Sequence, residues 1–402
     1  MKMSEEIIQK ESITDQKIPH ILKYMGSKRE ILDFVVQSIE ELEVESNWFC
    51  DLFSGTSVVG ASLKSKFNIH SNDIQSYSGL LARTYLSDLK SNIPFSSLAE
   101  IKNQVVKEVQ RFNDLFPELI YKYDDSLNLN EIVALEKEQQ KLIDKQFNIG
   151  FHLFTKYYSG TYWSYDQCVW IDAIRCIAEK HKDKPLYNAI MCSLISSMSY
   201  VTQSTGHYAQ YRDVNLKNME DILVYRRRDL WTYFERKFLD LITNLNGTPS
   251  RDSRITNLDY LDCLRLIDEG SIVYADPPYQ SVHYSRFYHA IETLVRYDYP
   301  AVSHKGRYRE DRHQSPFCKK TTVNDAFTSL FEAVSFKNAH LALSYSDTGM
   351  ISLFKIIGLA KKVFKDKYTV NVLEKEHTHS TMGRSDEKQQ LVTEYIVLFK
   401  RI

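Results

Sequence analysis

The chain has 402 residues, of which 43% are hydrophobic, and its 51 Lys and Arg residues nearly balance its 52 Asp and Glu residues. This length exceeds that of one typical domain, and the apolar content is sufficient for a large buried core. The balanced charge excludes a global electrostatic attraction to nucleic acid or to an acidic membrane surface, so such binding would depend on local clusters.

The N-terminal segment MKMSEEIIQKESITDQ is polar and has no apolar stretch of the kind found in signal peptides. No apolar run in the chain approaches the roughly 20 residues that cross a bilayer. We therefore expect a cytoplasmic protein without a membrane partner, whose first dozen or so residues form a frayed lead-in. Six cysteines without C-x-x-C spacing, several of them in apolar runs, favour buried thiols over zinc ligands or disulfides.

The first predicted elements form one βαβ unit. A helix begins near Ser27, after the glycine-containing turn 23–28 (KYMGSK), and carries apolar residues at helical spacing. Residues 48–53 (WFCDLF) predict a short buried strand and residues 58–66 the next helix. Residues 67–73 (FNIHSND) predict a second strand that ends in an acid. This order of strand, glycine turn, helix and strand is typical of a doubly wound α/β sheet.

The pattern changes between about residues 87 and 250, where helical periodicity alternates with charged runs and aromatic-rich loops. Strand-like apolar runs return at 271–275, 341–345 and 394–399. We therefore predict an α/β, doubly wound (Rossmann-like) core formed by residues 1–90 and 250–402. A mostly helical insertion at 91–249 interrupts this core.

The glycine turn after the first strand, DLFSGTSVVG at 51–60, lacks two features that bind phosphate. Gly55 and Gly60 have the spacing of a P-loop, but no Lys follows Gly60. Ser57 stands where a dinucleotide-binding turn has its second glycine. The turn therefore suits a ligand without phosphate, such as S-adenosylmethionine, and Asp73 is placed to bind ribose hydroxyls. The alternative is an ordinary strand-to-helix turn followed by an exposed acid.

The stretch VYADPPYQ at 273–280 puts Asp276 directly after a predicted strand, at the sheet edge where open α/β folds bind ligands. Its two consecutive prolines make the segment stiff. Asp276 and the carbonyl of Pro277 can accept both N–H groups of an exocyclic amine such as adenine N6, which directs the nitrogen lone pair at an incoming methyl group. Tyr279 offers a ring on which an extruded base can stack. Taken alone, such a tetrapeptide can also be a simple turn.

Five motifs in this order resemble those of the Dam-type (D12, α-group) adenine-N6 DNA methyltransferases. They are KYMGSK at 23–28, DLFSG at 51–55, ND at 72–73, NLDY at 257–260 and DPPY at 276–279. The resemblance covers roughly residues 20–90 and 250–400. It implies a Rossmann-like, S-adenosylmethionine-dependent methyltransferase core whose helical insertion contains the target-recognition region.

The resemblance also implies roles for individual residues. The residues that would contact S-adenosylmethionine are Tyr24, Lys28, Asp51, Phe53, Ser54, Gly55, Asp73, Asp259, Tyr260 and Asp276. Among these, Asp73 would hold the ribose, and Asp259 and Tyr260 would border the adenine. The catalytic residues would be Asp276, Pro277 and Tyr279. The insertion is longer than in the smallest members of the family, so the resemblance does not transfer a recognition sequence.

Binding of double-stranded DNA would require local basic clusters, because the net charge is near zero. One Arg-rich cluster, KGRYREDRHQSPFCKK, spans residues 305–320, and a second, RRR, spans 226–228. Arg suits phosphate and guanine contacts, although charge runs are often only solvated surface. The loop TGHYAQYR at 205–212 is a candidate for probing the duplex. The residues predicted to contact DNA are Tyr208, Tyr211, Arg212, Lys305, Arg307, Arg309 and Arg312.

His377 and His379 have no third ligand at a recognisable spacing, and methyl transfer to an amine requires no metal, so we predict a loop with two solvated histidines. The leading hypothesis is a monomeric enzyme that methylates adenine N6 in a specific DNA sequence by base flipping and direct transfer. It would form the modification half of a restriction–modification or related defence system, with a separate cognate endonuclease. Alternatives are an amine methyltransferase acting on cytosine N4, RNA or protein, and a non-catalytic DNA-binding subunit.

Overall fold

The structure, a computed structural model, describes residues 18–87, 89, 93–204, 207–245, 251–279, 281, 283–379 and 390–402. The predicted lead-in and both predicted boundaries of the insertion, at 90–91 and 249–250, lie outside these residues. A search of the described helices finds none long and apolar enough to cross a membrane.

Seven strands of the described chain form one mixed sheet in the order β3-β2-β1-β4-β7-β9-β8. They are β1 (Trp48–Asp51), β2 (Asn68–Asn72), β3 (Ser253–Thr256), β4 (Ile272–Ala275), β7 (His340–Ser346), β8 (Tyr368–His379) and β9 (Gln390–Arg401). The five strands from β3 to β7 run parallel, whereas β9 is antiparallel to β7 and β8. The chain moves outward from β1 to β2 and β3 and then returns to β4 on the other side of β1. A topological switch point therefore lies between β1 and β4, where open α/β sheets bind their ligands.

Helices cover both faces of the sheet, because side chains alternate between the faces along each buried strand. On one face, α1 (Leu32–Glu40) and α2 (Val58–Leu63) pack against Phe49, Ile272 and Ile396. On the other face, α11 (Tyr260–Leu266), α14 (Val323–Phe336) and α15 (Leu353–Phe364) pack against the alternate positions, including Val273 and Phe399. The 3₁₀ helix η2 (Lys28–Ile31) precedes α1. These layers confirm the predicted doubly wound α/β fold.

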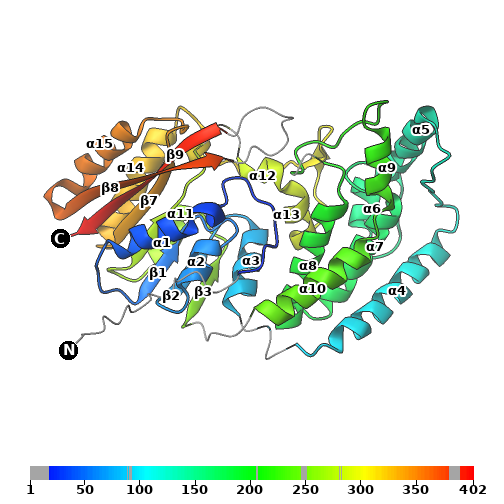
Figure 1. The fold of residues 1–402 in the computed structure, drawn as a ribbon, viewed down its shortest axis with the longest axis horizontal. Coiled ribbons are helices and arrows are strands. Elements are labelled where there is room, and N and C mark those ends of the chain that lie inside the picture. The colour runs from blue at the N-terminus through cyan, green and yellow to red at the C-terminus, as the bar shows by residue number, and fades with distance from the viewer. Residues whose placement is uncertain are drawn as a thin grey trace, which may run out of the picture.

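A block of helices lies beside the sheet-containing half of the molecule (Figure 1). Its elements are α4 (Ser97–Leu115), α5 (Leu129–Gln140), η3 (Lys141–Asp144), α6 (Leu153–Tyr158), α7 (Tyr165–Glu179), α8 (Pro185–Val201), α9 (Met219–Arg227) and α10 (Leu230–Asn244). Several begin at sequence-encoded caps: Asn128 and Ser164 each form a capping box, and Asp229 caps α10. The predicted helical character of this region is therefore confirmed.

The helical block shares one apolar cluster with α3 (Ser76–Leu86) and α13 (His289–Arg296), in which Leu80, Ile195 and Ile291 are fully buried. Figure 1 shows α3 and α13 between the sheet and the block. The intervening elements are α12 (Tyr284–Phe287), the hairpin of β5 (Val302–Ser303) and β6 (Tyr308–Arg309), and η4 (Pro316–Cys318). Residues that follow the DPPY segment thus pack on the helical block as well as on the core.

Two strands of the large sheet, β3 and β8, were not predicted from the sequence. β8 follows η5 (Lys365–Lys367) and contains His377 and His379, so the prediction that they lie in a loop is wrong. β8 is an edge strand that pairs with β9, and several of its side chains are exposed. Polar and apolar residues therefore alternate along its sequence, which has no continuous apolar run, and this explains why the strand was missed.

Candidate active site

A pocket lies at the switch point, at the carboxyl ends of β1, β2 and β4. All ten residues predicted to contact the cofactor line it: Tyr24, Lys28, Asp51, Phe53, Ser54, Gly55, Asp73, Asp259, Tyr260 and Asp276. They come from segments as far apart as residues 24 and 276, and the parallel sheet brings them together. The structure therefore supports one shared site, while the role of each residue remains a prediction.

The turn after β1 is held tightly beneath this pocket. Gly55 has φ +50°, and its N–H donates to Asp73 Oδ2 over 2.9 Å, which joins the ends of β1 and β2. A Cβ on Gly55 would lie 3.2 Å from the ring of Tyr24. Ser57 is also left-handed, at φ 58°, and leads into α2. Gly55 is thus required by its backbone conformation and by the close approach of Tyr24.

Asp51 and Asp73, two of the carboxylates that line the pocket, have no salt-bridge partner in the described part of the chain. Asp51 accepts a hydrogen bond from Gly60 N over 3.1 Å, and burial raises its pKa to about 7. Asp73 accepts from Gln75 N and Gly55 N, and burial raises its pKa to about 6 against the effect of these bonds. Perturbed acids in a cleft favour a ligand that brings donors or positive charge.

Aromatic residues form another wall of the pocket. The rings of Phe53 and Tyr260 stack with centroids 5.9 Å apart, and Phe317 meets both rings edge-on, at 5.5 and 5.1 Å. Leu258 and Pro316 lie beside them. This wall can take a flat, largely apolar group such as a purine. Phe317 is buried behind Phe53 and Tyr260 and supports this wall without lining the pocket.

The catalytic candidate Asp276 follows β4 and is tied to the N-terminal motif. Lys28 Nζ lies 3.1 Å from Asp276 Oδ1 and 2.6 Å from Glu394 Oε1. Ser344 Oγ donates to the same Glu394 oxygen over 2.6 Å. Burial raises the pKa of Asp276 to about 6, although the charge of Lys28 lowers it. Glu394 and Ser344 were missed, but an acid inside the apolar strand sequence VTEYIVLF was an available signal.

Tyr279, the other end of the DPPY segment, is buried against the sheet edge. Its ring meets Tyr345 edge-on at 5.7 Å, and its carbonyl accepts from Met350 N over 3.1 Å. A second pocket adjoins the first across Tyr24 and Lys28, which line both. The second pocket is also lined by Tyr279, His377 and Glu394. Lys28 and the DPPY segment thus stand between two neighbouring concavities.

A separate group of possible metal ligands lies between the sheet and α11. Cys50 and His70 are paired neighbours on β1 and β2, and Cys263 approaches them from α11. The sulfurs are 3.9 Å apart, and Cys263 Sγ is 3.8 Å from His70 Nε2. All three are buried, and their ligand atoms lie within 4.8 Å of one another. No sequence spacing indicates this group, because Cys263 is 213 residues from Cys50.

The two segments predicted to read DNA lie side by side. Lys305 forms an ion pair with Asp213, and its ammonium lies 5.0 Å from the ring of Tyr211. The Tyr308 hydroxyl donates to the carbonyl of Ala209. Lys305, Tyr211 and Arg212 keep partly or fully exposed surface, as does Arg312. The loop and the hairpin thus form one continuous edge of the molecule.

Three of the predicted DNA contacts are engaged within the protein. Tyr208 is buried, with 2% of its surface exposed. Arg309 is equally buried and holds Asp298 through two bonds of 2.6 and 2.8 Å, as well as Asp311. Arg307 donates to the backbone carbonyls of Tyr157 and Gln140. These bonds stabilise the fold of this edge, and Arg307 is only half-buried. Contacts of the three side chains with DNA stay a prediction.

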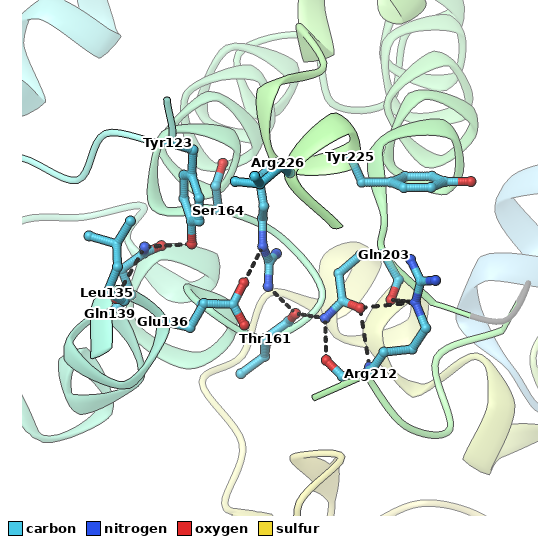
Figure 2. Close-up of polar contacts among 12 residues, drawn as sticks. Tyr123, Leu135, Glu136, Gln139, Thr161, Ser164, Gln203, Arg212, Tyr225 and Arg226 are labelled. Atoms are coloured by element: carbon cyan, nitrogen blue, oxygen red, sulfur yellow. Dashed lines mark hydrogen bonds and ion pairs between the residues drawn. The ribbon is translucent and has the colours of Figure 1, made fainter. Parts of the chain in front are cut away.

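Of the RRR cluster, Arg226 is internal (Figure 2), whereas Arg227 is exposed and Arg228 half-buried. Arg226 is buried; its Nε donates to Glu136 Oε1 and its Nη2 to the Thr161 carbonyl, both over 2.7 Å. Gln203 donates to the same carbonyl over 2.7 Å and exchanges hydrogen bonds with the backbone of Arg212. Arg226 therefore does not form an open basic surface; it fixes the base of the loop that carries Tyr211 and Arg212.

A doubly wound sheet with a glycine turn after β1 and a rigid Asp-Pro-Pro-Tyr segment after β4 defines a Rossmann-like methyltransferase. Comparison with known protein families gives the same class. The model of the D12 class N6 adenine-specific DNA methyltransferases matches residues 24–351, and the chain belongs to this family.

Several curated relatives match over most of the chain. Modification methylase LlaI from Lactococcus lactis subsp. lactis is 25% identical over 385 residues, which cover 94% of this chain and 55% of the relative. Type II methyltransferase M.FokI from Planomicrobium okeanokoites is 27% identical over 368 residues, which cover 86% of this chain and 49% of the relative. Type II methyltransferase M.NlaIII from Neisseria lactamica is 22% identical over 376 residues, which cover 91% of this chain and 95% of the relative. The chain thus spans about half the length of the first two relatives.

Proposed function

We propose that this protein transfers a methyl group from S-adenosylmethionine to N6 of adenine within a specific double-stranded DNA sequence. The observation that supports this most directly is the position of Asp276. It lies on a rigid segment at the sheet edge, and its partner Lys28 lines both the pocket at the switch point and the pocket beside Tyr279. One pocket would hold the methyl donor and the other the accepting base.

The residues of the first pocket fit S-adenosylmethionine. Phe53 and Tyr260 supply the wall for a purine, and Asp73 supplies an acceptor for ribose hydroxyls. Asp51 and Asp73, which have no ionic partner among the described residues, favour a ligand that carries positive charge. When bound, S-adenosylmethionine supplies a methyl group activated by a sulfonium. The turn offers no lysine for a phosphate, which argues against a nucleotide.

The residues beside the second pocket account for the rest of the reaction. The Asp276 carboxylate and the Pro277 carbonyl would accept the two N–H groups of adenine N6, and the prolines hold these acceptors in place. Transfer leaves the nitrogen with one proton too many, and Asp276 can accept it because burial raises its pKa to about 6. Tyr279 would stack on the base, which has to leave the duplex to reach this position.

The biological role proposed for the chain is protection of DNA in a restriction–modification system. The relatives are named modification methylase or type II methyltransferase, which supports this role. We propose a monomer that acts on DNA in the cytoplasm, while a cognate endonuclease acts separately. Tyr211, Arg212, Lys305, Arg307 and Arg312 are the residues proposed to face DNA, because they retain exposed surface.

The test is incubation of purified protein with tritiated S-adenosylmethionine and unmethylated genomic DNA, followed by digestion to nucleosides. We expect label in N6-methyl-2′-deoxyadenosine, and a loss of about 100-fold or more with Asp276→Ala. Asp366→Ala, which removes an exposed carboxylate on η5, is the matched control and should retain the wild-type rate. Label in a methylated deoxycytidine, or label that appears only when RNA or protein replaces the DNA, would support the other acceptors. Failure to bind S-adenosylmethionine in calorimetry would support a non-catalytic subunit.

A further inference from the structure

We propose that Glu394 is a positioning residue for the reaction: by sharing the Lys28 ammonium with Asp276, it keeps the catalytic carboxylate only partly neutralised and available to the amine. This inference rests on the proposed function of the same site. Nothing in the sequence motifs assigns Glu394 a role, because it lies on β9, more than 100 residues beyond the DPPY segment.

The geometry favours Glu394 as the stronger partner of Lys28. The Lys28 ammonium is 2.6 Å from Glu394 and 3.1 Å from Asp276. Glu394 is fixed in turn by the Ser344 hydroxyl on β7, and both side chains are almost completely buried. Burial raises the pKa of Glu394, but the charge of Lys28, with hydrogen bonds from His377, Lys28 and Ser344, outweighs burial and lowers the pKa to about 2. Glu394 is therefore an anion at any working pH.

Charge balance shows what this second carboxylate does. A buried Lys28 with Asp276 alone would form a neutral pair, in which the ammonium occupies the carboxylate that has to accept N–H groups. Two carboxylates around one ammonium leave one net negative charge. In a buried site this charge acts with little screening. Methyl transfer moves positive charge onto the amine beside Asp276, so the excess negative charge stabilises the transition state more than the ground state.

The surroundings of Asp276 allow a specific pH test. The titratable and charged groups that face it are Lys28 from η2, Glu394 from β9, Tyr274 from β4, Asp51 from β1, Tyr279 from the DPPY segment and Tyr284 from α12. Burial is the main cause that raises the pKa of Asp276, Lys28 opposes it, and Glu394 adds to it. Removing the charge of Glu394 should therefore lower the pKa of Asp276.

A purely structural role for Glu394 predicts something different. Its bond to Lys28 also ties the N-terminal motif to the last strand of the sheet. If that tie were the whole role, loss of Glu394 would lower the melting temperature and leave the pH profile unchanged. The two roles are thus separated by the acid limb of the rate profile, where activity falls as Asp276 becomes protonated.

The experiment compares wild type, Glu394→Gln and Glu394→Asp with the control Glu376→Gln, which makes the same change at an exposed position of the neighbouring strand. The single-turnover methylation rate of unmethylated plasmid DNA is measured from pH 5 to pH 8. We expect Glu394→Gln to be about 10- to 100-fold slower at pH 8, which is the effect expected when a residue that orients an active-site side chain, here Lys28, is removed. Its acid midpoint should lie below the wild-type value. Glu376→Gln should match wild type.

Glu394→Asp keeps the charge but withdraws it by one methylene. Its rate and acid midpoint should therefore lie between those of wild type and Glu394→Gln. If Glu394→Gln does not fold, the rate and acid midpoint of Glu394→Asp test the inference instead. A crystal structure of cofactor-free Glu394→Gln gives a readout independent of activity: Lys28 Nζ should move toward Asp276, from 3.1 Å to a closer contact. An unmoved midpoint in an active variant overturns the inference alone. A wild-type protein that does not methylate adenine overturns the proposed function and this inference together.

Discussion

Buried charges are incompletely compensated in the pocket at the sheet edge, whereas the helical block contains a buried charge that has its own partner. In the pocket, the described partners of Asp51 and Asp73 are backbone N–H groups, and Asp276 has to share one lysine with Glu394. In the helical block, Arg226 is matched one to one by Glu136. Incompletely compensated charge in a cleft is typical of a functional site, whereas a matched buried pair is a structural element.

This difference distinguishes residues that look alike in the sequence. Arg226 and Arg309 lie in the two most basic stretches of the chain, yet both are buried in ion pairs. Lys305 and Arg312, from the same stretch as Arg309, retain exposed surface. A basic cluster is therefore not one functional unit, and its members can be separated by whether their partner is internal.

The largest effect on stability is expected from Arg226→Met. The substitution leaves Glu136 buried without its partner, which costs about 3–5 kcal/mol in the free energy of unfolding. The neighbouring Arg227→Met removes an exposed pair with Asp125 and should cost about 1 kcal/mol or less. Urea denaturation of both variants measures the difference. Equal losses would show that the assignment of Arg226 to folding is wrong.

A smaller effect, on ligand binding, is expected from Gly55→Ala. The left-handed backbone costs a non-glycine residue roughly 1–2 kcal/mol, and the added Cβ would press on Tyr24. Tyr24 cannot retreat easily, because it is stacked between Tyr284 and Tyr288 at 5.1 and 4.7 Å. The turn should therefore shift and raise the Kd for S-adenosylmethionine about tenfold, as measured by calorimetry.

Gly358→Ala is the control for this change. Gly358 lies in α15, and a Cβ there meets no atom within 4 Å. The Kd should remain at the wild-type value, while the helix gains up to about 1 kcal/mol of stability. A Gly55→Ala protein with unchanged affinity would remove this turn from the cofactor site.

Much of the pocket could be predicted from the sequence, because its residues follow strands directly. A strand end in a parallel sheet is a local feature, so the strand pattern alone places Asp51, Asp73 and Asp276 at one edge. The five buried strands with apolar runs were predicted for the same reason. β3 and β8 were not predicted. β8 lies at a sheet edge, where polar and apolar residues alternate, and the residues of β3 are exposed or half-buried.

The remaining features depend on contacts between distant segments, which local patterns do not encode. Glu394 meets Lys28 across 366 residues, and Arg226 meets Glu136 across 90. Whether a charged side chain ends up exposed or paired is decided by such contacts. The predicted DNA residues therefore include two buried side chains, Tyr208 and Arg309, as well as side chains that keep exposed surface, a difference that a count of basic residues could not reveal.

The smallest effect is expected on the exposed side of this division. Lys305 pairs with Asp213 on the surface, and such pairs contribute about 0–1 kcal/mol, so Lys305 is free to exchange its partner for a phosphate. Lys305→Ala should weaken binding to all duplex sequences alike and reduce the slope of log K against log salt by about 0.9. Fluorescence anisotropy between low and moderate salt measures the slope. Lys355→Ala, on the exposed surface of α15, should leave it unchanged. If both variants keep the wild-type slope, the edge formed by the loop and the hairpin does not contact the DNA backbone through Lys305.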